Sequence, residues 1–221
     1  MGYKGRLYAV GIVILFNILR YYYYHQYLGY SFKASFFVLT AVFLLIAWFG
    51  GKQYDLARFY AERDPLTNVY NRLTIEKAFK KQASLCRSRG GKLAVALIDI
   101  NDFKEINDKH GHQKGDEVLQ FVAGLLLANA KKGNLVVRWG GDEFIHLISN
   151  VEPECQAAYI QNITKQLSHL TMEPLSPLSA SIGFAVYPDD GDSFERLIQR
   201  ADESMYEMKV DEKTKRPVKH D

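Results

Sequence analysis

Acidic side chains gather in two short segments of this 221-residue chain. Asp99 stands at the end of a continuous apolar run, and two glycines, Gly140 and Gly141, are followed at once by Asp142 and Glu143. An acid that ends a central strand can meet an acid of a neighbouring hairpin at one edge of a sheet. Magnesium takes hard oxygen ligands, usually one or two carboxylates together with substrate phosphates. Asp99 and Asp142 therefore predict a site for Mg²⁺, with Mn²⁺ as a substitute.

Two further features of these segments fit a metal-nucleotide site. The carbonyl of Ile100, directly after Asp99, can supply a third oxygen to the ion. Gly140 and Gly141 lack a Cβ, so a nucleotide can lie close against the backbone at the hairpin tip. A Gly-Gly-acid turn by itself is more often a plain structural turn, so the interpretation depends on both acidic segments together.

The periodicity of the chain after residue 63 predicts the elements that position these acids. Helical spacing of apolar residues predicts helices over 71–89, 118–130, 157–170 and 194–209. Apolar or alternating runs predict strands over 93–100, 135–139, 143–148 and 179–187, with Gly-Gly-Asp as a tight hairpin. We expect an α+β fold, a mostly antiparallel sheet flanked by helices on one or both faces.

Residues 1–51 differ from the rest of the chain because they are apolar and aromatic with few charges. The runs 7–19 and 34–51 predict two transmembrane helices, provided that Arg20 reaches the headgroups and the tyrosines after it lie in the interface. A cleaved signal peptide fits less well, because no small-residue cleavage site follows the first run. An apolar hairpin packed on the soluble domain is the other alternative. The distribution of Lys and Arg mildly favours both termini in the cytoplasm.

The overall composition excludes some functions. The chain has 28 Lys and Arg against 25 Asp and Glu, and no basic stripe with interleaved aromatic residues, so we expect no nucleic-acid partner. Cys86 and Cys155 lack the spacing of a metal site and are expected to be reduced thiols. His110 and His112 are expected to be loop or packing residues.

The acidic segments form part of a longer series of motifs that resembles the GGDEF family of diguanylate cyclases. The series covers residues 64–213, and its order along the chain makes the match far more specific than any single motif. The matching residues are Asp64-Pro65-Leu66-Thr67, Asn71-Arg72, Asp99 to Lys104, Asn107-Asp108, Gly111-His112, Gly115-Asp116, Gly140 to Phe144, Ser181-Ile182-Gly183, Ala201-Asp202, Tyr206 and Lys209. The resemblance implies a palm-like nucleotide-cyclase fold. It also implies an enzyme that condenses two GTP molecules into cyclic di-GMP and pyrophosphate.

The resemblance also implies roles for individual residues in catalysis. Asp99, the Ile100 carbonyl, Asp142 and Glu143 would hold the metal. Glu143 would help to activate the attacking 3′-hydroxyl, and Lys104 would assist at the phosphates. The 3′-hydroxyl of one GTP attacks the α-phosphorus of another, so an active homodimer is implied as well.

Substrate recognition is implied for a second group of residues. Asn107 and Asp116 would read guanine, since a carboxylate can accept from both N1–H and the exocyclic amine, which adenine lacks. The remaining contacts to GTP would come from Gly140, Gly141, Lys104, Lys209 and Lys213.

Some positions depart from the family pattern. Asn101 stands where many members have a second aspartate, and Lys213 stands where arginine is frequent. Lys131 and Asn134 occupy the positions of an Arg-x-x-Asp pair that binds product as an inhibitor. We therefore expect this inhibitory site for cyclic di-GMP to be absent.

The expected organisation has four parts: a two-helix membrane anchor over 1–51, a linker helix over 52–63, the GGDEF domain over 64–213 and a charged tail over 214–221. The protein would lie in the inner or plasma membrane with its GGDEF domain in the cytoplasm, where GTP is found. The alternative is a catalytically inactive GGDEF domain that serves as a GTP-binding or protein-interaction module. The complete Gly140 to Phe144 signature favours the enzyme, and argues against a class III nucleotide cyclase. We also expect Asp64 and Arg72 to form an ion pair, and Phe103 and Phe144 to lie in the core.

Overall fold

The computed structural model describes residues 2–29, 34–152, 155–169 and 177–215, with side chains of the last helix described up to residue 207. The chain divides into two compact units, Met1–Glu62 and Arg63–Asp221. Each unit has its own internal contacts.

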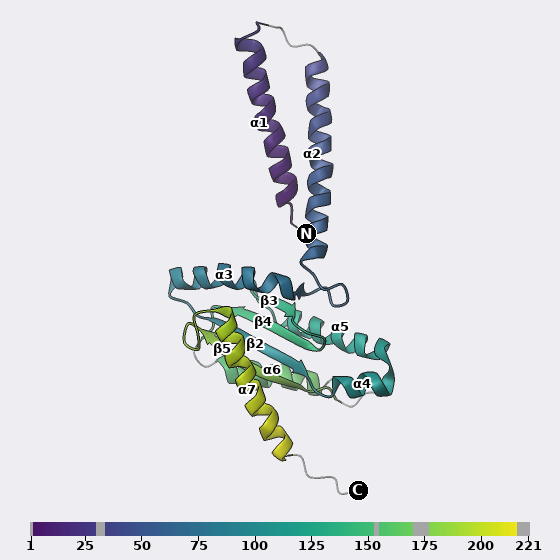
Figure 1. Ribbon diagram of the computed structural model, residues 1–221, viewed down its shortest axis with the longest axis vertical. Helices are drawn as coiled ribbons and strands as arrows, with labels where there is room; N and C mark the ends of the chain where they lie inside the picture. Colours follow the sequence, from purple (N-terminus) through teal and green to yellow (C-terminus); the bar gives the residue numbers. More distant parts are fainter. Residues whose placement is uncertain (1, 30–33, 153–154, 170–176, 216–221) are drawn as a thin grey trace. The chain divides into compact units, whose positions relative to one another are not determined.

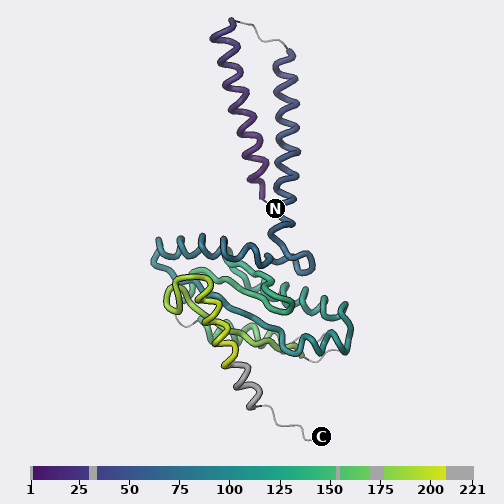
Figure 2. Tube along the Cα trace, viewed as in Figure 1, coloured from purple at the N-terminus to yellow at the C-terminus, as the bar shows by residue number. Residues whose placement is uncertain are grey.

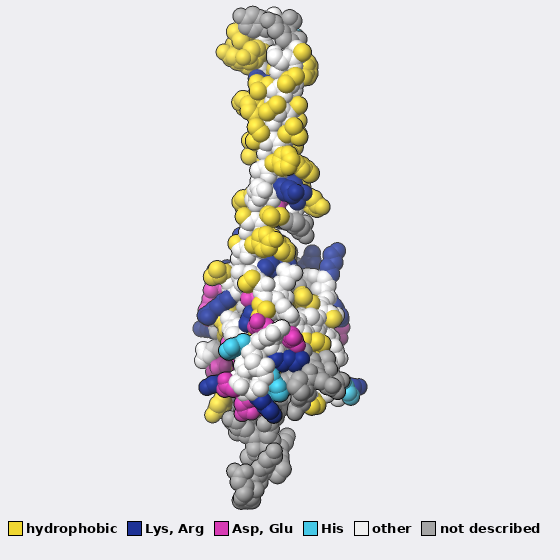
Figure 3. Space-filling model, turned by 90° about the vertical axis from the view of Figure 1, so that its right-hand side faces the viewer, with side chains coloured by type: hydrophobic (Ala, Val, Ile, Leu, Met, Phe, Trp, Pro, Cys, Tyr) yellow, Lys and Arg dark blue, Asp and Glu magenta, His cyan; other side chains and the backbone are white. Residues whose placement is uncertain are grey.

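The first unit is a pair of helices, α1 (Lys4–Gln26) and α2 (Ala34–Ala61), which pack along each other (Figure 1). Both helices are long and apolar enough to cross a membrane, by length and composition. Figure 3 shows hydrophobic side chains along the visible face of these helices, whereas the visible face of the second unit carries charged side chains of both signs among other residues. Helix α2 continues without a break to Ala61, two residues short of the end of the expected linker helix over 52–63.

Polar contacts join the two helices at both ends. The Arg20 guanidinium donates to the Phe36 carbonyl at 3.1 Å and to the Thr40 hydroxyl at 2.8 Å, so it is held against α2. At the other end, the Asp55 carboxylate accepts hydrogen bonds from the backbone N–H groups of Gly5 (2.7 Å) and Arg6 (3.3 Å). These N–H groups lack partners within α1, so a side chain of α2 caps α1.

The second unit is built on a five-stranded sheet with the order β1-β3-β4-β2-β5. The strands are β1 (Tyr70–Asn71), β2 (Leu93–Ile100), β3 (Leu135–Arg138), β4 (Glu143–Ser149) and β5 (Ala180–Tyr187). Only the short pair β1–β3 is parallel, and the other neighbours are antiparallel. The expected α+β fold with a mostly antiparallel sheet is confirmed.

Helices cover both faces of this sheet, as Figures 1 and 2 show. One core packs alternate residues of the strands against α5 (His112–Ala128) and α6 (Cys155–Ser168), with the short helix α4 (Phe103–His110) at its edge. The other core packs the remaining residues against α3 (Arg72–Arg89) and α7 (Phe194–Lys215). Because both faces are covered, β2 is apolar at almost every position. Phe144 is fully buried and Phe103 partly buried, as expected.

The elements that the sequence did not predict are β1 and α4, and α5 begins well before its predicted start at residue 118. Strand β1 has only two residues, and α4 and the first residues of α5 are mostly polar. Their positions depend on contacts with the sheet, such as the packing of Phe103 and Ile106 of α4 against the core.

Candidate active site

The predicted metal acids lie together at one end of the central strands. Asp99 of β2 is directly opposite Glu143 of β4, so both side chains leave the same face of the sheet, the face that α3 and α7 cover. The next pair is Ile100 and Asp142, where the Ile100 N–H donates to the Asp142 carbonyl at 3.3 Å. The three acids are half-buried. The sheet therefore brings Asp99, Asp142 and Glu143 to the same end of two neighbouring central strands.

The hairpin between β3 and β4 is tight at the two glycines. The backbone N–H groups of Trp139 and Gly140 both donate to the Glu143 carbonyl, at 2.8 and 3.2 Å. The Glu143 carboxylate folds back over the turn, so a Cβ at Gly140 would overlap its Oε2. A side chain at position 140 would therefore push the Glu143 carboxylate away from the turn.

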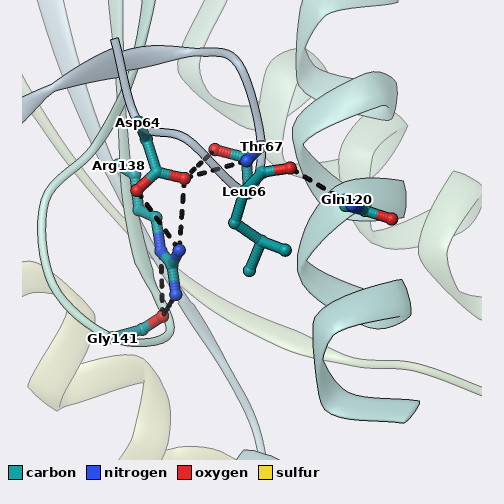
Figure 4. Close-up of polar contacts among 6 residues, drawn as sticks. All are labelled: Asp64, Leu66, Thr67, Gln120, Arg138 and Gly141. Atoms are coloured by element: carbon teal, nitrogen blue, oxygen red, sulfur yellow. Dashed lines mark hydrogen bonds and ion pairs between the residues drawn. The ribbon is translucent and has the colours of Figure 1, made fainter. Parts of the chain in front are cut away.

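Arg138 fixes the tip of this hairpin to the start of the domain (Figure 4). Its Nη2 and Nε donate to the Gly141 carbonyl at 2.7 and 3.2 Å, and its Nη1 lies 3.2 and 3.3 Å from the two carboxylate oxygens of Asp64. Asp64 also accepts from the Thr67 N–H (2.9 Å) and hydroxyl (2.7 Å). The expected ion pair between Asp64 and Arg72 is wrong, because Arg72 lies over the Trp139 ring at 4.2 Å.

The electrostatics of Asp64 follow from these contacts. Burial by itself raises the pKa of this carboxyl, but hydrogen bonds from Thr67 and Arg138 and the charge of Arg138 outweigh burial and lower the pKa below its usual value. Asp64 is therefore ionised at neutral pH and can hold Arg138.

The turn that carries Asp64 also contacts α5. Gln120 donates from Nε2 to the Leu66 carbonyl at 3.2 Å (Figure 4). The same helix carries Asp116, about one turn before Gln120. The turn at Asp64–Thr67 therefore contacts both the hairpin tip and helix α5, which carries the predicted guanine reader Asp116.

The two predicted guanine readers lie close together. Asn107 on α4 packs across Gly115 on α5, so that a Cβ at Gly115 would overlap the Asn107 Oδ1. Phe103 packs on the same glycine, 3.3 Å from the position of that Cβ. Asp116 directly follows Gly115 and is exposed.

Of the three lysines predicted to contact GTP, only Lys104 has a described side chain. Lys104 is exposed on α4. Lys209 and Lys213 lie on α7 beyond residue 207, so their side chains fall outside the described part of the chain. Lys131 and Asn134 form a turn before β3, where the Asn134 Oδ1 accepts from the Ser149 N–H at 3.1 Å.

A divalent metal fits the donors at this edge by their chemistry. Among the described residues, no three His, Cys, Asp or Glu side chains gather at one point. Mg²⁺ does not need such a cage, because it usually binds one or two carboxylates and keeps substrate phosphates and waters as its other ligands. Asp99, Asp142 and Glu143 supply only hard oxygen, which suits Mg²⁺ and not a soft metal.

Sequence reasoning missed several residues of the site. It did not predict roles for Arg138, Thr67 or Gln120. The only local signal was a charged residue two positions before Gly140, and nothing near Gln120 indicated a contact with Leu66.

This arrangement, with acids at the end of a central strand facing a Gly-Gly-acid hairpin, defines a nucleotide-cyclase type of α+β domain. Residues 61–215 match the family model described as "Diguanylate cyclase, GGDEF domain", so the chain belongs to the GGDEF family.

Individual relatives agree with this assignment. Diguanylate cyclase DosC of Escherichia coli is 33% identical over 156 residues, which cover 69% of this chain and 34% of DosC. The match therefore spans about a third of that relative. A sensory box/GGDEF protein of Caulobacter crescentus is 31% identical, with a TM-score of 0.63 and coverage of 68% of this chain and 99% of the solved chain. The coiled coil and GGDEF domain of DgcB from the same organism, solved with c-di-GMP, is 26% identical with a TM-score of 0.67, covering 72% and 86%.

Proposed function

We propose that this protein is a membrane-anchored diguanylate cyclase, which condenses two GTP molecules into cyclic di-GMP and pyrophosphate. The observation that carries the proposal is the register of β2 and β4, which sets Asp99 opposite Glu143 beside the Gly-Gly tip. Family membership and the similarity to DosC, a named diguanylate cyclase, support the same reaction.

In this proposal the residues of the chain bind and orient the substrate. Asp99, Asp142 and the Ile100 carbonyl hold Mg²⁺, which, when bound, supplies positive charge at the phosphates of GTP. Glu143 accepts the proton of the attacking 3′-hydroxyl or helps to hold the metal. Lys104, Lys209 and Lys213 would contact the phosphates of GTP in this proposal.

Guanine selection follows from the pair on α4 and α5. Asp116 accepts from two N–H groups of guanine, and Asn107 is held against Gly115 beside it. Adenine leaves the acceptor unpaired, which strongly disfavours ATP. Gly140 and Gly141 leave room for the nucleotide at the tip.

Assembly and location are part of the same proposal. Each domain holds one GTP, so two copies must face each other for the 3′-hydroxyl to reach the second α-phosphorus. Helices α1 and α2 anchor the chain in the inner or plasma membrane, with the GGDEF domain on the cytoplasmic side where GTP is found. Because Lys131 and Asn134 replace the Arg-x-x-Asp pair, bound cyclic di-GMP should inhibit the enzyme weakly or not at all.

The test uses the full chain in detergent or nanodiscs, with GTP and Mg²⁺, and separates the nucleotide products by chromatography. We expect cyclic di-GMP, with a rate per protein that rises with protein concentration. Asp142→Asn and Glu143→Gln should lower the rate about 10²- to 10³-fold, the loss typical of a group that stabilises transition-state charge. Asp192→Asn, at an exposed acid before α7, is the matched control and should keep wild-type activity.

Two outcomes oppose the enzyme proposal. If the wild-type chain binds GTP but forms no cyclic di-GMP, the domain is a GTP-binding or interaction module. If Asp142→Asn and Glu143→Gln retain wild-type rates, the predicted acids are not the catalytic ones.

A further inference from the structure

Asn101 is joined to β5 by both its backbone and its side chain. Its N–H donates to the Ser179 carbonyl at 3.0 Å, and its Nδ2 donates to the Ser179 hydroxyl at 3.0 Å. The Ser181 hydroxyl donates to the Asn101 Oδ1 at 2.8 Å. Both polar atoms of this amide are therefore used within the protein.

These contacts lie beside the predicted metal acids. Ser181 is directly opposite Asp99 in the β2–β5 ladder, just as Glu143 is opposite Asp99 on the other side. Ser181 is fully buried, although it is polar. Glu143, Asp99 and Ser181 thus form one row across three strands. The ladder ends one pair further on, at Ile100 and Ala180, and the contact between Asn101 and Ser179 follows directly after that pair.

The end of a strand is the part that frays most easily, because the ladder has no further pairs to hold it. Asp99 and the Ile100 carbonyl are the last residues of β2, so fraying there would move two predicted metal ligands. The contacts of Asn101 with Ser179 and Ser181 continue the ladder past that end and tie it down.

We propose that Asn101 is a positioning residue and not a metal ligand: the Asn101–Ser179–Ser181 clamp holds the end of β2, and with it Asp99 and the Ile100 carbonyl, in the arrangement that binds Mg²⁺. This inference rests on the proposed function and deepens it. Groups that orient metal ligands through hydrogen bonds commonly change metal affinity or activity by about 10- to 100-fold when they are removed.

The clamp makes a prediction that separates it from direct ligation. A carboxylate at position 101 can accept hydrogen bonds from both serine hydroxyls, so Asn101→Asp keeps the clamp, whereas Asn101→Ala and Ser181→Ala break it. If Asn101 were a ligand, Ser181→Ala would leave metal binding unchanged, and Asn101→Asp would tighten it through the added charge.

The experiment measures the metal midpoint, which is the metal concentration that gives half-saturation, in two ways on the full chain. The first is cyclic di-GMP formation against Mg²⁺ concentration, and the second is Mn²⁺ binding by electron paramagnetic resonance with a non-reactive GTP analogue. We expect Asn101→Ala and Ser181→Ala each to raise the midpoint about 10-fold. The double variant should be little worse than either single variant, and Asn101→Asp should stay within about threefold of wild type, the difference its added charge can make. Hydrogen exchange at the Ile100 amide should quicken in both clamp-breaking variants.

Asn129→Ala is the matched control. Asn129 also bonds two side chains, Gln166 and Asn162, but it joins α5 to α6 away from this edge. Its loss should leave the metal midpoint unchanged. The clamp is overturned if Ser181→Ala keeps the wild-type midpoint and Ile100 exchange. A wild-type chain that binds Mn²⁺ and the analogue but makes no product would refute the proposed reaction alone, since the Mn²⁺ midpoints would still decide the clamp.

Discussion

Replacing Arg138 should disturb the position of the β3–β4 hairpin while leaving its acids, Asp142 and Glu143, in the sequence. Arg138→Ala deletes two hydrogen bonds to the Gly141 carbonyl and the ion pair with Asp64, whose side chain is 17% exposed, as is that of Arg138. A charge-assisted hydrogen bond contributes about 1.5–3 kcal/mol, and an unpaired Asp64 adds a cost of its own. We therefore expect a loss of about 2–4 kcal/mol in the free energy of unfolding. Because Gly141 precedes Asp142, we also expect turnover to fall about 100-fold, the cost of a misplaced reactive group.

The assay combines urea unfolding with turnover of GTP. Unfolding can be followed by Trp139 fluorescence in a Trp48→Phe background, which leaves one tryptophan in the chain. Arg138→Lys should recover charge but not the forked contact, and so should restore stability more than activity. A double-mutant cycle with Asp64→Ala should give a coupling of about 1–2 kcal/mol. A coupling near zero, or Arg138→Ala with wild-type turnover, would refute the idea that this contact positions the hairpin.

Three further predictions address other parts of the molecule. Gly115→Ala should raise the KM for GTP at least 10-fold with little change in fold stability, because its Cβ would displace the Asn107 side chain; steady-state kinetics would detect this. Burial lowers the pKa of His146 from 6.5 to about 4. Between pH 6.5 and pH 4 this imidazole is therefore protonated in the unfolded chain and neutral in the folded chain. The free energy of unfolding should fall by up to about 3 kcal/mol as the pH drops through this range. Urea unfolding at several pH values should show a flatter dependence in His146→Gln. Asp55→Ala should speed hydrogen exchange of the first amides of α1, which Asp55 caps; a mass-spectrometric exchange profile unchanged at residues 5 and 6 would contradict that cap.

Local sequence patterns were sufficient for the central strands. The apolar run that contains Asp99 near its end forms a buried strand, β2. The Gly-Gly turn forms the tight hairpin before β4. Burial on both faces demands an unbroken apolar run, and glycines are common in tight turns, so both features appear in the sequence itself.

The short helix α4 and the early start of α5 could not be predicted in this way. The residues around Gly111 are polar, and their helices depend on packing of Phe103 and Ile106 against the core and of Asn107 against Gly115. Such contacts follow from the fold and leave no periodic trace in a polar segment.

The side-chain contacts that organise the site were the least predictable part. Asp64 and Arg138 are 74 positions apart, and Leu66 and Gln120 are 54 apart. A charge before a turn does not reveal its partner over such distances, and the nearer candidate Arg72 was the wrong one.

The same long-range contacts indicate where the control of the site should be sought. The turn at Asp64 immediately follows the segment that α2 leads into, and it contacts both the hairpin tip, through Arg138, and the helix of Asp116, through Gln120. A displacement of this turn would therefore act on the metal edge and on guanine recognition at once, whereas the Asn101 clamp acts on the metal edge alone. Variants at Gln120 should then change both the KM for GTP and the metal midpoint, whereas Ser181→Ala should change the metal midpoint alone. That contrast follows from which strand or helix each side chain holds.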